Sequence, residues 1–238
     1  MGSTNQVIVF VFFGEQFVEQ FRVCSHTIPK SWNIKVITDV KFSIPFENLF
    51  ECIVVPTPTN VYDMLTFRKR IPEFIQIKKY DRVWYSDPDM LFTGDILSKY
   101  QNSDDILLAY EPNVSLRHPC LCGGFSEEEL CELERINAPA INGGFYSVPK
   151  AKYDFFRQYK DLCNFFESKW PENKSTDQYI LNNLYHRKLN EFKLFTSDEI
   201  KYHPQEKDGV FGLVNHYIGM GMEKIELMRN ELKRLLNA

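Results

Sequence analysis

The feature that most constrains the fold is an uninterrupted apolar run near the N-terminus, residues 7–13, which ends at Gly14. Strands buried on both faces of a parallel sheet have such continuous runs, whereas half-exposed strands alternate apolar and polar residues. Apolar residues then recur at helical spacing over residues 15–24, and residues 33–39 have the composition of a second strand. A strand, a helix and a strand in this order predict a right-handed βαβ unit, and therefore an α/β fold.

The rest of the chain continues to alternate short apolar runs with amphipathic segments. Pro72 leaves open whether the helix predicted over residues 64–77 ends or kinks there. The closing helix has one apolar face and mixed charges elsewhere, which favours docking on the domain over membrane anchoring. No linker or repeat is visible, so we expect one domain over residues 1–238. The predicted strands lie in residues 51–58, 83–85, 104–110 and 191–204, and the predicted helices in residues 64–77, 127–136, 150–166 and 223–236.

The charge balance argues against nucleic acid as a partner. The chain has 28 basic and 32 acidic residues, a formal charge of −4 at pH 7, and no dense cluster of Lys and Arg. The apolar run at residues 7–13 is too short to cross a bilayer, and no charged segment typical of a signal peptide precedes it. We therefore expect a soluble, cytoplasmic protein without a transmembrane segment.

Six cysteines are spread through the chain. In a chain of this size we expect free thiols in a reducing compartment. His118, Cys120, Cys122 and Cys131 form the densest group, but they lack the two paired spacings of structural zinc sites. They are therefore left out of the predicted site.

Two acidic residues, Asp87 and Asp89, follow the strand predicted at residues 83–85 and are separated only by Pro88. Alternate residues of an extended chain point to the same side, so the two carboxylates are expected close together, which is costly unless a positive charge joins them. Mn²⁺ or Mg²⁺ meets this requirement and could hold a phosphorylated ligand, at the sheet edge where open α/β folds bind ligands. A solvated acidic turn explains the motif alone equally well.

Three further groups admit both a functional and a structural explanation. Arg68 and the two basic residues after it could bind phosphate or form a solvated helix face. The paired glycines after Asn142 could let a ligand approach the backbone, or could form a tight turn. Asp177 and Gln178 fall in the first turn of a predicted helix, where the helix dipole favours an acid, although they could also face a cleft.

The order of these motifs resembles that of nucleotide-sugar glycosyltransferases of the GT-A fold. After the βαβ start come R-x-x-I-P-E, D-x-D, N-x-G, D-Q-x-x-L-N and a late H-x-x-G. The likeness runs from residue 7 to residue 224 and is strongest to the retaining group that includes glycogenin and the bacterial lipopolysaccharide galactosyl- and glucosyltransferases. It implies a single Rossmann-like GT-A domain, with a mixed, mostly parallel central sheet flanked by helices.

The resemblance also implies roles for individual residues. Asp87, Asp89 and His216 match the family's metal ligands, which bind Mn²⁺ (or Mg²⁺) and through it the diphosphate of the donor. Asp177 and Gln178 match the Asp-Gln pair of the donor-sugar pocket, where either could stabilise the oxocarbenium-like centre. The other matched positions contact the nucleotide sugar in the family: Phe13, Gly14, Thr38 and Asp39 beside the nucleoside, Arg68 before the D-x-D strand, Asn142 and Gly144 beside the donor sugar, and Gly219 near the phosphates.

Two positions depart from the family pattern. The family continues its late motif as H-F-x-G-x-x-K-P-W, but here Met222 stands in place of that lysine and Pro-Trp is absent. Lys224, two residues further on, could bind phosphate instead. Pro88 stands between the aspartates where small residues are usual, which leaves both carboxylates in place.

The sequence thus predicts a metal-dependent glycosyltransferase that moves a sugar from a nucleoside-diphosphate sugar to a hydroxyl of a glycan, a lipid-linked acceptor or a protein, with retention implied by the resemblance. One alternative is a nucleotidyltransferase, but such enzymes carry a glycine-rich basic loop after the first strand, and FFGEQFVEQF has one glycine and no lysine. The other is a module that binds nucleotide sugars without turnover. Measuring nucleotide release with Mn²⁺ separates the enzyme from the binding module.

Overall fold

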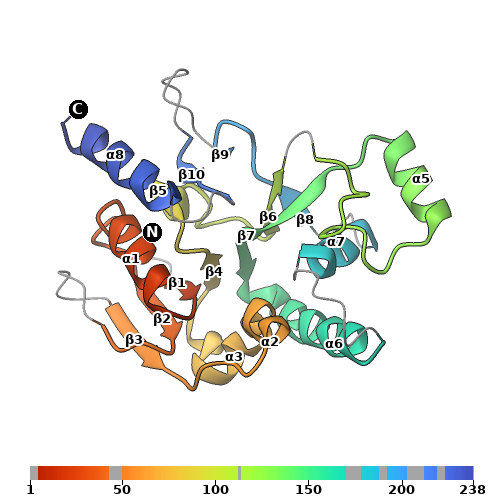
Figure 1. The fold of residues 1–238 in the computed structure, drawn as a ribbon, viewed down its shortest axis with the longest axis horizontal. Coiled ribbons are helices and arrows are strands. Elements are labelled where there is room, and N and C mark those ends of the chain that lie inside the picture. Colours follow the sequence, from red (N-terminus) through yellow and green to blue (C-terminus); the bar gives the residue numbers. More distant parts are fainter. Residues whose placement is uncertain are drawn as a thin grey trace.

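A computed structural model describes residues 5–42, 50–111, 114–169, 178–187, 192–202, 212–218 and 223–237. Its centre is a seven-stranded sheet with the strand order β3-β2-β1-β4-β7-β6-β8 (Figure 1). The strands are β1 (Gln6–Val11), β2 (Ile34–Thr38), β3 (Phe50–Val54), β4 (Arg82–Ser86), β6 (Ile106–Glu111), β7 (Ala140–Pro149) and β8 (Phe192–Leu194).

The large sheet is mixed and mostly parallel, as predicted. β1 pairs in parallel with β2 and β4, β2 with β3, and β6 with β8, whereas β7 runs antiparallel to both of its neighbours, β4 and β6. Val7, Ile8, Val9 and Phe10 of β1 are 0% exposed, because both faces of this central strand are covered. The continuous apolar run therefore has the doubly buried position that it predicted.

A second sheet consists of three short strands in the order β5-β10-β9. They are β5 (Met90–Phe92), β9 (Ile200–Tyr202) and β10 (Val214–His216). β10 runs antiparallel to β5, with His216 opposite Met90, and parallel to β9. Since β5 follows β4 after residues 87–89, this pairing brings a late segment of the chain to the acidic pair at the end of β4.

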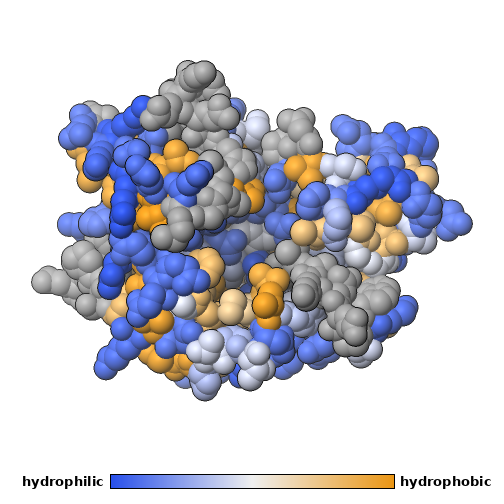
Figure 2. Space-filling view, in the orientation of Figure 1, coloured by the Kyte–Doolittle hydropathy of each residue, from blue (hydrophilic) through white to orange (hydrophobic). Residues whose placement is uncertain are grey.

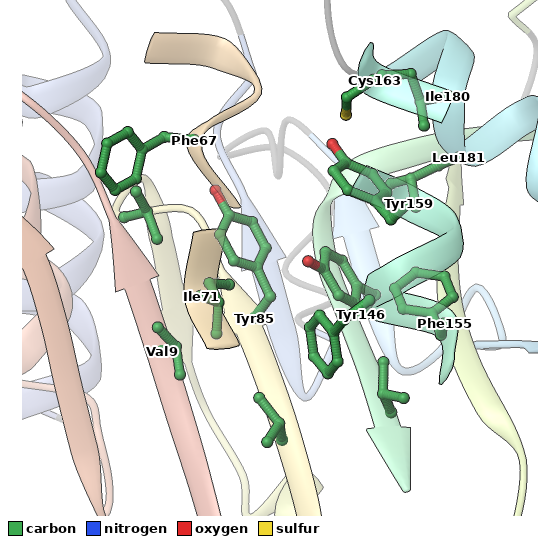
Figure 3. Close-up of a cluster of buried hydrophobic side chains, with 14 of the residues drawn as sticks. Val9, Phe67, Ile71, Tyr85, Tyr146, Phe155, Tyr159, Cys163, Ile180 and Leu181 are labelled. Carbon is green, nitrogen blue, oxygen red and sulfur yellow. The ribbon is translucent and has the colours of Figure 1, made fainter. Parts of the chain in front are cut away.

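Helices cover both faces of the large sheet, and each face has its own apolar core. One core joins the sheet to α2, α3, α6 and α7 and includes Tyr85, Tyr146 and Phe155 (Figure 3). The other joins it to α1, α4, the small sheet and α8, around Phe21 and Trp84. The helices are α1 (Glu15–Ser25), α2 (Val61–Leu65), α3 (Ile71–Phe74), α4 (Ile96–Lys99), α5 (Glu127–Arg135), α6 (Asp154–Lys169), α7 (Gln178–Arg187) and α8 (Glu223–Asn237).

The prediction of one helix over residues 64–77 is wrong. α2 is instead followed by a 3₁₀ helix (Phe67–Arg70), α3 and a second 3₁₀ helix (Ile77–Lys79). Pro72 lies at the start of α3, and its ring and missing N–H prevent a continuous helix from running through this position. Within the first 3₁₀ helix Arg68 is only 7% exposed, so this residue is not part of a solvated face.

Two other boundaries differ from the predictions. β7 begins at Ala140, so Gly143 and Gly144 lie inside the strand rather than in a turn before it. The segment after β7 begins with a 3₁₀ helix (Lys150–Lys152), and α6 then starts at Asp154.

The segment around α5 lies to one side of the sheet and has a small apolar cluster of its own, which includes Leu116, Leu121 and Leu130. Ser126 and Glu129 form a reciprocal capping box at the start of α5. Figure 2 shows mostly hydrophilic side chains over this helix, at the upper right.

The C-terminal helix α8 packs against α1 and β5 (Figure 1). Ile225 and Met228 are buried in this contact, and Arg229 pairs with Glu19 of α1 at the surface. Among the described residues, no helix combines the length and apolar character needed to span a bilayer.

Candidate metal and ligand site

Asp87 and Asp89 lie in the turn between β4 and β5. Backbone hydrogen bonds fix this turn from two sides: Asp87 N–H donates to the carbonyl of Gly144 in β7 (2.8 Å), and Tyr217 N–H donates to the carbonyl of Asp89 (3.0 Å). The Asp87 side chain is 29% exposed and Asp89 is 8% exposed. The acidic pair is therefore an anchored and largely enclosed turn, and not the solvated loop that was its alternative explanation.

His216, the last residue of β10, completes a group with the two aspartates. One ligand atom from each residue, a carboxylate oxygen or an imidazole nitrogen, lies within 4.8 Å of the other two. His216 Nε2 stands 3.3 Å from Asp89 Oδ1. This is near the separation of about 3 Å between adjacent ligands of an octahedral ion whose bonds are about 2.1 Å long.

The hydrogen bonding of this group also suits a metal. Asp89 Oδ1 and His216 Nδ1 are buried and make no hydrogen bond, although buried polar atoms are normally paired. Two carboxylates and one imidazole suit Mn²⁺ or Mg²⁺ and leave coordination positions for other oxygens. Within the described part of the chain, no other set of His, Cys, Asp and Glu side chains meets in this way.

Two basic side chains offset the charge of the carboxylates. Arg68 Nη2 lies 3.8 Å from Asp87 Oδ1, and the guanidinium also donates to the carbonyl of Gly143. Lys224 Nζ, in the first turn of α8, lies 2.8 Å from Asp89 Oδ2, and only 11% of its side chain is exposed. With both acids ionised these charges cancel, so a divalent cation would make the site positive and favour an anionic ligand.

Burial and neighbouring charges affect the two acids differently. Burial raises the pKa of Asp87, although the Arg68 guanidinium opposes this change. Burial would also raise the pKa of Asp89, but the His216 imidazole and the Lys224 ammonium reverse the effect and lower it to about 2. Asp89 is therefore ionised at neutral pH, as metal coordination requires.

Gly144 leaves space for the side chains of His216 and Asp87. A Cβ at this position would stand 2.4 Å from His216 Cε1 and 2.8 Å from Asp87 Oδ2. The Gly144 N–H donates to Asn142 Oδ1 (2.8 Å), and Asn142 Nδ2 donates to Glu111 Oε2 (3.3 Å). Asn142 and Gly144 thus form the wall of the site on the side of β7.

Sequence reasoning missed Tyr85. Its hydroxyl donates to Asp87 Oδ1 (2.6 Å), and the Arg68 guanidinium lies over its ring, 4.1 Å from the centroid. The ring also stacks on Tyr146 of the neighbouring strand, with centroids 5.0 Å apart (Figure 3). Tyr85 precedes Asp87 by two residues, so the alternation of side chains along a strand is a signal that could have placed it on the same side.

A cavity of about 250 Å³ lies beside the carboxylates, and Arg68, Asp87 and Asp89 form its charged wall. Figure 2 shows a hollow near the middle of the face in view. Side chains from the end of β1 and from α1 and α2 supply an apolar wall, which consists of Val11, Phe12, Phe13, Phe17, Met64 and Leu65.

Of the residues predicted beside a nucleoside, Phe13 lines this cavity. Gly14 and Asp39 instead bond to each other at the ends of β1 and β2, because Gly14 N–H donates to Asp39 Oδ1 (2.8 Å). Gly14 has a φ of 95°, a conformation that glycine adopts without strain. Thr38 is 0% exposed, so protein atoms enclose its side chain.

The remaining predicted residues follow β7 in the sequence. Gln178 is the first residue of α7 and lines the cavity. Asp177, Gly219 and Met222 lie outside the described residues.

No protein-family profile and no curated protein matches the chain. Among solved structures, the chain is similar to the glycosyltransferase GlyE of Streptococcus pneumoniae TIGR4, with a TM-score of 0.61 and 15% identity over 99% of this chain and 63% of that one. The bifunctional glycosyltransferase WbbM, in its apo form, gives a TM-score of 0.58 and 11% identity over 99% of this chain and 52% of that one. The chain thus spans less than two thirds of the length of either protein. At these identities the similarity shows the fold, and the predicted α/β fold class is confirmed.

Proposed function

We propose that this protein is a metal-dependent glycosyltransferase that moves a sugar from a nucleoside-diphosphate sugar to a hydroxyl acceptor. The observation that carries the proposal is the group of Asp87, Asp89 and His216, whose ligand atoms lie within 4.8 Å of one another beside a cavity of about 250 Å³. The fold shared with glycosyltransferases agrees with this activity. A fold alone does not fix a function, so the chemistry of the site is the stronger argument.

In this proposal Asp87, Asp89 and His216 hold Mn²⁺ or Mg²⁺, and Tyr85 orients Asp87 through its hydroxyl. The ion supplies a Lewis acid that stabilises negative charge on the leaving diphosphate. Arg68 and Lys224, 3.8 Å and 2.8 Å from the carboxylates, present fixed positive charge to the phosphate oxygens. Lys224 takes the role of the family lysine whose position Met222 occupies here.

The donor sugar would lie against Asn142, Gly144 and Gln178. Asp177 and Gln178 are the candidates for stabilising the oxocarbenium-like centre. With retention, the bond from C1 to the phosphate oxygen breaks with its electron pair on that oxygen, and the acceptor oxygen bonds to C1 from the same face. The acceptor proton passes to the leaving phosphate. The acceptor is a hydroxyl of a glycan, a lipid-linked molecule or a protein.

The first test is a thermal-shift screen of UDP-, GDP- and ADP-sugars with Mn²⁺ or Mg²⁺. A ligand that binds the native state raises the melting temperature, and EDTA should abolish this increase. Nucleoside diphosphate release from the best donor is then measured with and without sugar acceptors. The proposal predicts release that requires the metal and that is lost in Asp89→Asn.

The outcomes separate the alternatives. Donor binding without release or transfer under any metal would identify a binding module. A nucleotidyltransferase would instead join a nucleoside triphosphate to a sugar phosphate, with release of pyrophosphate from the triphosphate. Release that continues at the same rate in EDTA would contradict the metal requirement.

A further inference from the structure

Helix α1 buries a glutamine side chain, Gln20, whose carbonyl oxygen accepts no hydrogen bond. Gln20 is 4% exposed, and its Oε1 atom is enclosed and receives no hydrogen bond. Ser25, also buried on this helix, differs because its hydroxyl donates to the carbonyl of Arg22 (2.7 Å). An unpaired buried carbonyl is destabilising, and an apolar side chain at position 20 would avoid the cost. Gln20 therefore calls for an explanation other than packing.

The surroundings of Gln20 point to a ligand. Gln20 lines the same cavity as Asp87 and Asp89. Phe17, one helical turn earlier, lines it as well, so the two side chains are neighbours on one face of α1. The cavity thus combines a charged wall, an aromatic and aliphatic wall, and a carboxamide.

We infer that Gln20 binds the edge of the nucleobase of a nucleoside diphosphate, so that it adds affinity for nucleotides over phosphorylated ligands that lack a base. This inference rests on the proposed function, in which the metal and Arg68 hold the diphosphate. A flat heteroaromatic ring suits the wall formed by Phe12 and Phe17, because its faces are apolar and its polar atoms lie at its edge. A sugar, with hydroxyls around its ring, would leave several of them without partners against this wall.

The carboxamide can meet a base edge at little cost. The terminal torsion of a glutamine side chain has a broad, roughly two-fold preference, and no hydrogen bond holds Oε1 of Gln20 in its present orientation. The amide offers one acceptor and two donors. Uracil, guanine, cytosine and adenine each present a donor next to an acceptor, so Gln20 adds affinity for a base without selecting one alone.

The test compares ligands with and without a base. Titration calorimetry with Mn²⁺ measures the affinity of pyrophosphate and of UDP, GDP, ADP and CDP for the wild-type protein and for Gln20→Leu. Gln101→Leu is the matched control, because Gln101 is exposed and is not part of the cavity wall. Melting temperatures in EDTA verify folding, and Gln20→Met replaces the leucine variant if that variant does not fold.

We expect the wild-type protein to bind at least one nucleoside diphosphate more tightly than pyrophosphate. Gln20→Leu should weaken that nucleotide about tenfold, the value of one hydrogen bond at the upper end of its usual range, and leave pyrophosphate affinity unchanged. The melting temperature in EDTA should be equal to or higher than that of the wild type. Gln101→Leu should change none of these quantities.

Four results would overturn the inference. An undiminished preference for the nucleotide in Gln20→Leu, or a wild-type protein that binds pyrophosphate as tightly as every nucleotide, would refute the role of Gln20 and leave the metal and diphosphate site standing. Equal weakening of pyrophosphate and nucleotide would assign Gln20 to the shape of the site. Failure of all five ligands to bind the wild-type protein with Mn²⁺ would reject the proposed function together with the inference.

Discussion

Two buried carboxylates flank the small sheet, and they differ in how many of their oxygens accept hydrogen bonds. Asp89 precedes β5 and Glu199 precedes β9, and they are 8% and 2% exposed. The backbone carbonyl of each accepts a bond from the β10 segment, from Tyr217 N–H (3.0 Å) and Val214 N–H (2.8 Å) respectively. Each carboxylate also pairs with a lysine. Their environments are therefore similar in position, burial and charge.

The difference lies in the hydrogen-bond donors that the fold supplies. Both oxygens of Glu199 are satisfied, because the Tyr100 hydroxyl donates to Oε1 (2.6 Å) and Thr196 N–H donates to Oε2 (2.7 Å). Asp89 Oδ1 receives no hydrogen bond and lies near the imidazole of His216. A saturated carboxylate fixes a loop, whereas one with an open oxygen can bind an ion. The two acids thus differ in whether an oxygen is left for an ion, and this difference is seen without reference to any other protein.

The strongest test removes one charge from each acid. Asp89→Asn should reduce Mn²⁺-dependent affinity for a nucleoside diphosphate by more than about 100-fold, because a neutral amide is a poor ligand for a hard cation. Glu199→Gln, the matched change, should leave that affinity within about twofold, since Glu199 contacts only structural donors. Calorimetry measures both variants. Similar losses of affinity in the two variants would erase the distinction between the acids.

Filling the space at Gly144 tests whether the geometry of the metal group matters. In Gly144→Ala, a Cβ 2.4 Å from His216 Cε1 should displace the imidazole and lower Mn²⁺ affinity about 10- to 100-fold. Gly94→Ala is the control, because its Cβ would meet Leu213 Cδ2 at 2.6 Å, away from the carboxylates. Both variants should lose about 1–3 kcal/mol of stability through overpacking. Unchanged Mn²⁺ affinity in Gly144→Ala would show that His216 is not a ligand.

The structural role of Glu199 predicts a dependence of stability on pH. Burial alone would raise the pKa of Glu199, but the bonds from Lys99, Tyr100 and Thr196 lower it below its usual 4.5. The bonds therefore stabilise the fold fully above pH 4.5, and this contribution is lost as the pH falls through the lower pKa of the folded state. In EDTA at pH 7, Glu199→Gln should be less stable by about 1–3 kcal/mol. The difference should shrink below pH 4.5 in denaturant titrations, and a difference independent of pH would contradict this account.

The smallest effects concern the two lysines. Lys224→Met should weaken nucleoside diphosphate binding about threefold to tenfold, because the ammonium contacts phosphate in the proposal. It should also lower the stability in EDTA, since Asp89 loses a buried counter-charge 2.8 Å away. Lys99 is 51% exposed, so Lys99→Met should cost less than about 1 kcal/mol and leave binding unchanged. Calorimetry measures the affinity of the two variants for the nucleoside diphosphate, and thermal melts measure their stability. Weaker binding in Lys99→Met would mean that the Glu199 region also contacts the ligand.

Much of the fold could be predicted because its signals are local. The continuous apolar run of β1 indicated a doubly buried strand, and the charged segment at residues 127–136 indicated a helix where α5 lies. The helix over residues 64–77 could not be placed correctly, because the consequences of Pro72 depend on packing between the segment and the sheet. The glycines of β7 were misplaced for a similar reason, since a close approach between strands is invisible in one strand alone.

The candidate site was predictable where chemistry alone narrows the choice. Two aspartates flanking a proline suggested a metal from their chemistry, whereas His216 was added only by the resemblance to the glycosyltransferase motifs. Asp87, Asp89 and His216 do lie together. The requirement for a glycine at position 144 depends on atoms from the turn after β4 and from β10, and the importance of Gln20 depends on a cavity formed by several elements. Neither follows from residue type or spacing, because both arise from contacts between segments far apart in the chain.

The pairing of β10 with β5 has a consequence for the order of folding. Met90 lies opposite His216 in this pairing. The pairing therefore joins Asp87 and Asp89, in the first half of the chain, to an imidazole from its last part. Forming such a long-range contact closes a large loop, which is entropically expensive and slow compared with local structure. During synthesis the parallel strands β1 to β4 can assemble first, whereas the ion-binding geometry must wait for β10. We therefore expect the proposed ion-binding geometry to form in one of the last folding steps.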